Sequence, residues 1–368
     1  MHAHLVDAQT CPGHTVFPAS GTHLDALVGK TPLIDLRLSY KGKRLKVLVK
    51  AEQYNLTGSI KDRVALFILN RALRAGQLRL GDTIVEASSG NSGIAFAAIG
   101  RALGCRVKIF MPARMSIERQ QLLRSLGADL ELVSDAQGGF QEALRRCDLY
   151  ASTHDGVFSP DQFTNELNCR AHEHTTGAEI LAQLRDIGTQ PAALVAGVGT
   201  GGTIMGVGRA LKSHFANIRL CAMEPAESPT LSTGYKSGRH RLQGLFDEFV
   251  PDILKLEELD DIIQVNDGDA IVMAQRLSRE LGLAVGLSSG ANLIAAIKVA
   301  ECLPEEAAVI TVFCDDNKKY LSTDLCKQEP VRADYIAPEI DFLGFRAHGF
   351  DEASATAPAG KVNAAVPA

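Results

Sequence analysis

The sequence lacks several features that would mark whole classes of protein. It has no tryptophan, no apolar run near the ~20 residues that span a bilayer, and no basic-then-apolar leader in its opening stretch, MHAHLVDAQT. No basic run stands out, and the formal net charge is -5. We therefore expect neither a membrane nor a nucleic acid as partner. A cytoplasmic protein that acts on small molecules fits these absences.

Paired cysteines are also lacking. The eight cysteines stand singly, with no CxxC pair and no metal-ligand spacing. We interpret most of them as core thiols in a reducing compartment and predict no metal site. Cys11-Pro12, followed by His14, can mark a haem-responsive site, but in this terminal stretch we interpret it as an ordinary loop.

What the sequence does have is an alternation of short strand patterns and longer helical patterns. This alternation predicts βαβ units and an α/β fold, with mostly parallel sheets covered by helices on both faces. Strands are predicted at 44–51, 82–86, 106–111, 129–133, 193–196, 219–223 and 307–313. Helices are predicted at 61–76, 94–103, 117–126, 203–214, 269–281 and 291–300.

One strand-to-helix junction, ALVAGVGTGGTIMGVG, is rich in glycine. Gly197, Gly199 and Gly202 fit the G-x-G-x-x-G pattern, and Glu224 follows about 20 residues later, as in a dinucleotide-binding unit. The N-terminus of a helix would hold any other phosphate equally well. This segment alone leaves both interpretations open.

Four other polar segments favour a different cofactor: the segment 55–63, which contains Lys61, and three polar turns. Lys61 stands at the start of a predicted helix, where the helix dipole disfavours a cation and helps to free the amine for a Schiff base. The three polar turns lie at 88–93, 285–292 and 314–320. Polar turns that follow strands commonly line the ligand-binding crevice of an open α/β sheet. A phosphate cradle together with such a lysine suggests pyridoxal phosphate, whose aldehyde takes the lysine.

From about residue 28 to 325 the chain resembles the cysteine synthase and cystathionine β-synthase family, which has the tryptophan synthase β-like fold of pyridoxal phosphate (PLP) enzymes, fold type II. The resemblance lies in an ordered series of motifs: 29–33 (GKTPL), 57–63 (TGSIKDR), 89–93 (SGNSG), 116–119 (SIER), 162–179, 199–203 (GTGGT), 286–290 (GLSSG) and 315–322 (DDNKKYLS).

The resemblance implies a role for each matched residue. Lys61 would be the catalytic residue, binding the cofactor's aldehyde and later moving the α-proton. The other cofactor-binding residues would be Asn91, Gly199, Thr200, Gly201, Gly202, Thr203, Ser288 and Asp315. The substrate's carboxylate would be held by Ser88, Ser89, Gly90, Asn91, Ser92 and Gln162. Glu224 would then be a core or helix-edge residue.

The implied reaction is β-replacement on an O-activated L-serine, O-acetylserine or O-phosphoserine, through an α-aminoacrylate intermediate. A sulfur nucleophile would give cysteine or a cysteine analogue. The alternatives are cystathionine β-synthase, a thiosulfate-using enzyme, a diaminopropionate-pathway synthase, a serine/threonine dehydratase, a dinucleotide enzyme or a non-catalytic binding protein.

The sequence departs from the family in three places. In the segment 243–251, Phe246, Asp247 and Glu248 replace small residues near the expected entrance, which puts the choice of nucleophile in doubt. Arg239 and Arg241 either bind a substrate phosphate or are exposed loop residues. Asp316 takes the place of a serine near the expected pyridine ring.

The expected domain organisation also follows from the resemblance. Residues 26–61 and 165–327 would form a large PLP-binding subdomain, and 62–164 a small, mobile substrate-binding subdomain. Residues 1–25 and 328–368 would be extensions, the latter largely disordered from about 350. A homodimer is expected.

Overall fold

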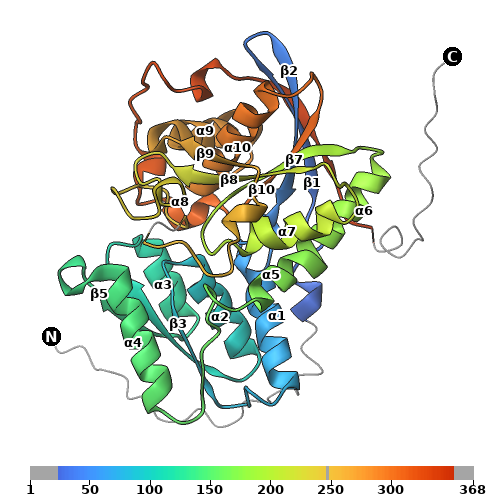
Figure 1. The fold of residues 1–368 in the computed structure, drawn as a ribbon. Coiled ribbons are helices and arrows are strands. Elements are labelled where there is room, and N and C mark those ends of the chain that lie inside the picture. The colour runs from blue at the N-terminus through green and yellow to red at the C-terminus, as the bar shows by residue number, and fades with distance from the viewer. Residues whose placement is uncertain (1–23, 246–247, 352–368) are drawn as a thin grey trace.

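The chain folds into two halves, each built around its own β-sheet. The computed structural model describes residues 24–245 and 248–351. Figure 1 shows the larger sheet and its helices in the upper half and the smaller sheet in the lower half, with α1 and α5 beside the junction.

The larger sheet has seven strands in the order β11-β1-β2-β10-β7-β8-β9. From β2 to β9 neighbouring strands run parallel, whereas β1 runs antiparallel to both β2 and β11. In that order the strands are Asp341–His348, Leu33–Tyr40, Lys43–Ala51, Ala308–Phe313, Pro191–Gly197, Arg219–Pro225 and Asp261–Val265.

Helices cover both faces of this sheet because the side chains of its strands alternate between two apolar clusters. Val47 and Val49 of β2 pack in the cluster that contains α9 and α10, whereas Leu48 packs in the cluster that contains α6 and α7. These helices are α9 (Asp267–Leu281), α10 (Leu287–Glu301), α6 (Ala178–Asp186) and α7 (Gly202–Lys212); a short α8 spans Thr230–Thr233.

The smaller sheet is parallel, with the strand order β5-β4-β3-β6. Ile84 packs in a cluster with α1, α2 and α3, whereas Val85 packs against α4 on the other side. The strands are β3 (Thr83–Ala87), β4 (Arg106–Pro112), β5 (Asp129–Val133) and β6 (Val157–Phe158). The helices are α1 (Lys61–Arg74), α2 (Asn91–Ala102), α3 (Ile117–Ser125) and α4 (Gly139–Thr153).

A helix with an irregular middle links the halves. It starts as α5 (Leu167–Ala171), widens into a π-helical turn at His172–Gly177 and continues as α6. Such turns are rare and often lie at functional sites.

The predicted fold class is confirmed, and each strand and helix predicted from the sequence has a counterpart in the structure. The strands β1, β6 and β9, the helices α4 and α8, and the helix from 167 to 186 were not predicted from the sequence. No element was predicted in the C-terminal extension either, yet β11 pairs with β1 and completes the edge of the larger sheet. Among the described helices, none combines the length and apolar character needed to cross a bilayer.

Candidate active site

Lys61 is the first residue of α1, and the loop before it is fastened to the segment after β10. Ile60 N–H donates to Cys314 O at 2.9 Å, and Asp316 N–H donates to Gly58 O at 3.2 Å. Gly58 has φ +75°, and a Cβ there would lie 2.4 Å from Asp316 Oδ2. The glycine of this turn is therefore required both by backbone conformation and by space.

The amine of Lys61 points at the glycine loop of the larger half. Its Nζ donates a hydrogen bond to Thr200 Oγ1 at 3.3 Å. Burial lowers the pKa of Lys61 to about 8. With this pKa about a tenth of the amine is uncharged at pH 7, and the uncharged amine is the form that attacks an aldehyde.

The glycine loop joins β7 to α7 and leaves no room for side chains at its glycine positions. Gly201 has φ +87°, a Cβ on Gly199 would lie 2.8 Å from Gly244 O, and a Cβ on Gly202 would lie 2.1 Å from Asn168 Oδ1. The loop ends at the N-terminus of α7, where backbone N–H groups and the helix dipole favour a phosphate.

Two buried residues hold the threonines of this loop. Asn168 Nδ2 donates to Thr200 Oγ1 at 2.8 Å, and His172 Nε2 lies 3.3 Å from Thr203 Oγ1. Burial lowers the pKa of His172 well below its usual value, so the ring is neutral. Both residues belong to the helix with the π-helical turn. They lie in the motif 162–179, but no role was predicted for them from the sequence.

The serine-rich turn lies across the cleft, between β3 and α2. Ser88 Oγ accepts hydrogen bonds from Gly90 N and Gly93 N at 3.0 and 2.9 Å, so it caps the start of α2. Ser92 Oγ donates to Gln162 Oε1 at 2.5 Å. The turn and Gln162 therefore form one hydrogen-bonded unit.

Asn91 connects this turn to the larger half. Its Nδ2 donates to Asp315 Oδ2 at 2.8 Å, and Tyr320 OH donates to the same oxygen at 2.6 Å. Within the described residues, Asn91 Oδ1 is buried without a hydrogen-bond partner. Burial raises the pKa of Asp315. Asp315 thus fixes the orientation of the Asn91 amide.

A single cavity brings most of the predicted site residues together. It is lined by Lys61, Ser88, Ser89, Asn91, Ser92, Phe140, Gln162, Phe163, Gly199, Thr200 and Gly244. Ser288 is the second residue of α10 and is 4% exposed. Of the remaining predicted residues, Gly90, Gly201, Gly202 and Asp315 flank the lining residues in the chain or bond to them, whereas Thr203 contacts His172.

These residues fit pyridoxal phosphate. The glycines of the loop pack so closely on their neighbours that a Cβ at Gly199 or Gly202 would clash, the Lys61 amine faces the loop, and Asn91 brings an unpaired buried oxygen to the cavity wall. Ser288 offers a neutral hydroxyl at a helix N-terminus. Lys61, the loop from Gly199 to Thr203, Asn91 and Ser288 would hold the cofactor.

The dinucleotide interpretation has no support from Glu224. Its carboxylate accepts hydrogen bonds from Leu231 N at 2.7 Å and from Ser232 Oγ, so it caps α8. It is 2% exposed and is not free to bind a ribose. This agrees with its interpretation as a core residue.

The two arginines near the entrance differ. Arg241 is bound to Glu329 and Asp324, at 2.8 and 3.2 Å, and lines neither the inner cavity nor its outer vestibule. Arg239 lines the outer vestibule, which shares Ser89, Phe140 and Gly244 with the inner cavity. Only Arg239 remains a candidate for a phosphate contact.

Asp316 is tied to the buried Lys319, whose Nζ lies 3.2 Å from Asp316 Oδ1 and donates to Gly58 O at 2.9 Å. This residue therefore supports the loop before Lys61. Of the other sequence features, Cys11-Pro12, Phe246 and Asp247 lie outside the described residues.

The fold and the site together define a class, the PLP-dependent enzymes with an α/β fold, and comparison with known proteins agrees. A family model described as pyridoxal-phosphate dependent enzyme matches residues 24–315. The chain is 41% identical over 303 residues to a cysteine synthase of Staphylococcus aureus, covering 82% of this chain and 96% of the relative.

Solved structures are also similar. A hydrogen sulfide-producing enzyme from Fusobacterium nucleatum is 48% identical, with a TM-score of 0.84 over 87% of this chain and 96% of that one. A variant of it was solved with an α-aminoacrylate intermediate. An O-acetylserine-dependent cystathionine β-synthase from Helicobacter pylori is 31% identical, with a TM-score of 0.76 over 84% and 98%. The chain belongs to the family of PLP-dependent enzymes, among its cysteine synthase-like members.

Proposed function

We propose that the chain catalyses PLP-dependent β-replacement on an O-activated L-serine, with a sulfur nucleophile giving cysteine or a cysteine analogue. The observation that carries this proposal is the cavity in which the Lys61 amine faces both the glycine loop and the turn formed by Ser89 and Asn91. The similarity of the chain to the cysteine synthase of Staphylococcus aureus supports the same reaction class.

The cofactor, when bound, supplies an aldehyde for amines and an electron-accepting ring that stabilises charge at the substrate's Cα. Lys61 binds the cofactor and then acts as the base that takes the α-proton, for which a pKa of about 8 is well placed. Thr200, within hydrogen-bond distance of Nζ, orients this amine.

The turn after β3 orients the substrate. Backbone N–H groups and hydroxyls of Ser89 and Ser92, with the amide of Gln162, bind the carboxylate. Holding the carboxylate fixes the direction of the Cα–H bond toward Lys61, which is catalysis by positioning. Phe140 and Phe163 line the same cavity, and their rings pack edge to face at 5.9 Å, so they limit the access of water.

A second candidate reaction runs the same chemistry with sulfide as the leaving group. The observation that favours it is the 48% identity to the hydrogen sulfide-producing enzyme of Fusobacterium nucleatum. L-cysteine would then be the substrate, and water or a thiol would take the place of sulfide at the β-carbon.

Product analysis with matched donors tests these proposals. We expect O-acetylserine and sulfide to give cysteine and acetate in equal amounts. Sulfide released from L-cysteine at a higher kcat/KM would favour the second reaction. Pyruvate formed at a rate independent of any added nucleophile would contradict both and indicate a dehydratase. A comparison of O-acetylserine with O-phosphoserine in the Arg239→Gln variant tests the phosphate contact.

A further inference from the structure

Glu86 is a buried carboxyl group directly behind the proposed carboxylate site. It lies on β3, two residues before Ser88, and is 3% exposed. Its Oε1 accepts hydrogen bonds from Gln162 Nε2 at 3.2 Å and from Ala87 N at 3.1 Å. Among the described residues, its Oε2 is buried without a hydrogen-bond partner. No residue role assigned so far accounts for an acid at this place.

Both N–H donors of the Gln162 amide and its oxygen already make hydrogen bonds in this structure. Nε2 has two N–H groups, and they point to Glu86 Oε1 and to Ala87 O, at 3.2 and 3.3 Å. Oε1 accepts from Ser92 Oγ. An amide has only these two donors, so Gln162 can bind a substrate carboxylate only by withdrawing a donor from one of these two partners.

We propose that Glu86 is a positioning residue for substrate binding, because its carboxyl group and the substrate's carboxylate compete for the same Gln162 amide. This inference rests on the proposed function of the Ser89–Gln162 site. An ionised Glu86 holds the amide by a charge-assisted bond and also repels the substrate's negative charge. A protonated Glu86 binds the amide weakly and releases it.

The surroundings of Glu86 shift its pKa into a pH range in which substrate binding can be measured. Burial raises the pKa of Glu86 to about 8. The titratable groups that face it are Lys61 at the start of α1, Cys147 on α4 and Asp161 in the loop before α5. Asp161 raises the pKa further by its negative charge, and Lys61 lowers it. We therefore expect tight substrate binding below pH 8 and weaker binding above it.

The test is the affinity of the PLP-loaded protein for L-alanine, which has the α-carboxylate and α-amino group but no group to lose. Affinity is measured from the change in visible absorbance and by calorimetry, in the wild type and in Glu86→Gln. Glutamine keeps the acceptor for Gln162 and cannot ionise. The substrate's amino group titrates equally in both proteins, so the ratio of the two dissociation constants isolates Glu86.

With a pKa near 8, the dissociation constant of the wild type relative to Glu86→Gln should rise about tenfold between pH 7 and pH 9. In activity assays the same change should appear in KM and not in kcat. A ratio that stays constant over this range would overturn the inference. If the wild type fails to respond to any amino acid, the proposed function itself fails, and the two failures are thereby distinguished.

Asp161→Asn provides a second variant that leaves the Gln162 contacts in place. Asp161 is exposed and has φ +57°, a conformation that asparagine tolerates well. Removing its charge lowers the pKa of Glu86, so the loss of affinity should begin at lower pH than in the wild type. An unchanged midpoint would assign the pH dependence to another group and overturn the inference even if Glu86→Gln does not fold.

Discussion

Lys61 owes its chemistry to its surroundings. An exposed lysine would be protonated at neutral pH, but burial lowers the pKa of this one to about 8. Its contact with Thr200 Oγ1 also places the amine at the glycine loop that would carry the cofactor's phosphate. Reactivity and position are thus set by the same few contacts.

Replacing Lys61 with alanine should abolish turnover, because the variant lacks both the amine that binds the cofactor and the base that takes the α-proton. We expect a loss of at least about 10³-fold in kcat, with an unchanged thermal unfolding midpoint. Lys318→Ala is the matched control, since its side chain is 80% exposed; it should keep wild-type activity. Appreciable turnover in the Lys61 variant would contradict the mechanism.

The sequence was sufficient to predict Lys61 and the glycine loop as site residues, because each belongs to a short motif, although the choice of cofactor needed the other polar segments as well. It was not sufficient for Glu86, whose importance depends on burial and on a contact with Gln162, 76 positions away. Ser88 shows the same limit. Its hydroxyl was predicted to bind substrate, but its visible contacts are to the backbone of α2.

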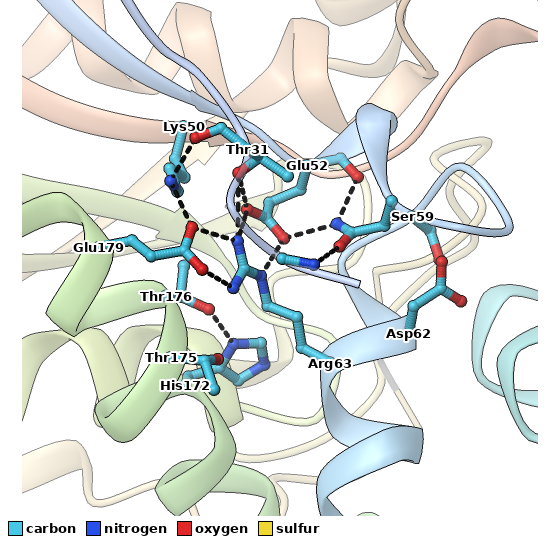
Figure 2. A network of polar contacts seen from close by, with 12 residues as sticks. Thr31, Lys50, Glu52, Ser59, Asp62, Arg63, His172, Thr175, Thr176 and Glu179 are labelled. Atoms are coloured by element: carbon cyan, nitrogen blue, oxygen red, sulfur yellow. Dashed lines mark hydrogen bonds and ion pairs between the residues drawn. The ribbon is translucent and has the colours of Figure 1, made fainter. Parts of the chain in front are cut away.

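At the scale of elements, the start of α1 is held by a buried network of charges, which Figure 2 shows. Arg63 binds Glu52 through Nε at 2.6 Å and Glu179 through Nη1 at 2.7 Å, and Thr31 Oγ1 donates to Glu52. Lys50 Nζ lies 2.7 Å from Glu179 Oε2. The network joins β2, the loop after it, α1 and α6, so it fixes the helix on which Lys61 stands.

Removal of Arg63 would leave two buried carboxylates without their main partner. We expect Arg63→Gln to lower the free energy of unfolding by about 3 kcal/mol, measured by urea denaturation at pH 7. Arg74→Gln, at the exposed end of the same helix, is the matched control and should change it by less than about 0.5 kcal/mol. Equal effects of the two substitutions would mean that the network does not stabilise the helix.

The pH dependence of stability follows from the same network. Burial alone would raise the pKa of Glu52, but Arg63 outweighs this and holds it at about 2, below the usual value of 4.5. A carboxyl group with a lowered folded-state pKa stabilises the protein above its unfolded-state pKa. Its contribution is therefore complete above about pH 4.5 and is lost as the pH falls toward 2. In Arg63→Gln the main influence that lowers the pKa of Glu52 is gone while burial still raises it, so this loss of stability at acid pH should shrink or reverse.

Elements with clear periodicity, such as α9, could be predicted to within a few residues, whereas edge strands could not. β11 alternates between partly and fully exposed positions, so it lacks the continuous apolar run of a buried strand. The helix from 167 to 186 is interrupted by a π-helical turn, which breaks the 3.6-residue pattern on which helix prediction depends.

At the scale of the whole molecule, the site lies where the two halves meet. Arg119 of α3 donates to Gln243 Oε1 at 2.7 Å and to Lys319 O at 3.0 Å, and Ser116 Oγ donates to Lys319 O at 2.7 Å. Asn91 and Asp315 make a further link across the cleft. We propose that the half containing residues 62–164 moves as a unit when the substrate's carboxylate binds, and that the protein is a homodimer.

The central claim is that Lys61 carries pyridoxal phosphate and presents it to an activated serine. The visible absorption spectrum of the purified protein, before and after adding O-acetylserine and then L-cysteine, tests this claim most directly. We predict a yellow protein whose absorbance band shifts to longer wavelength with a substrate and returns when a sulfur nucleophile is added. A protein that stays colourless after incubation with pyridoxal phosphate would contradict the account.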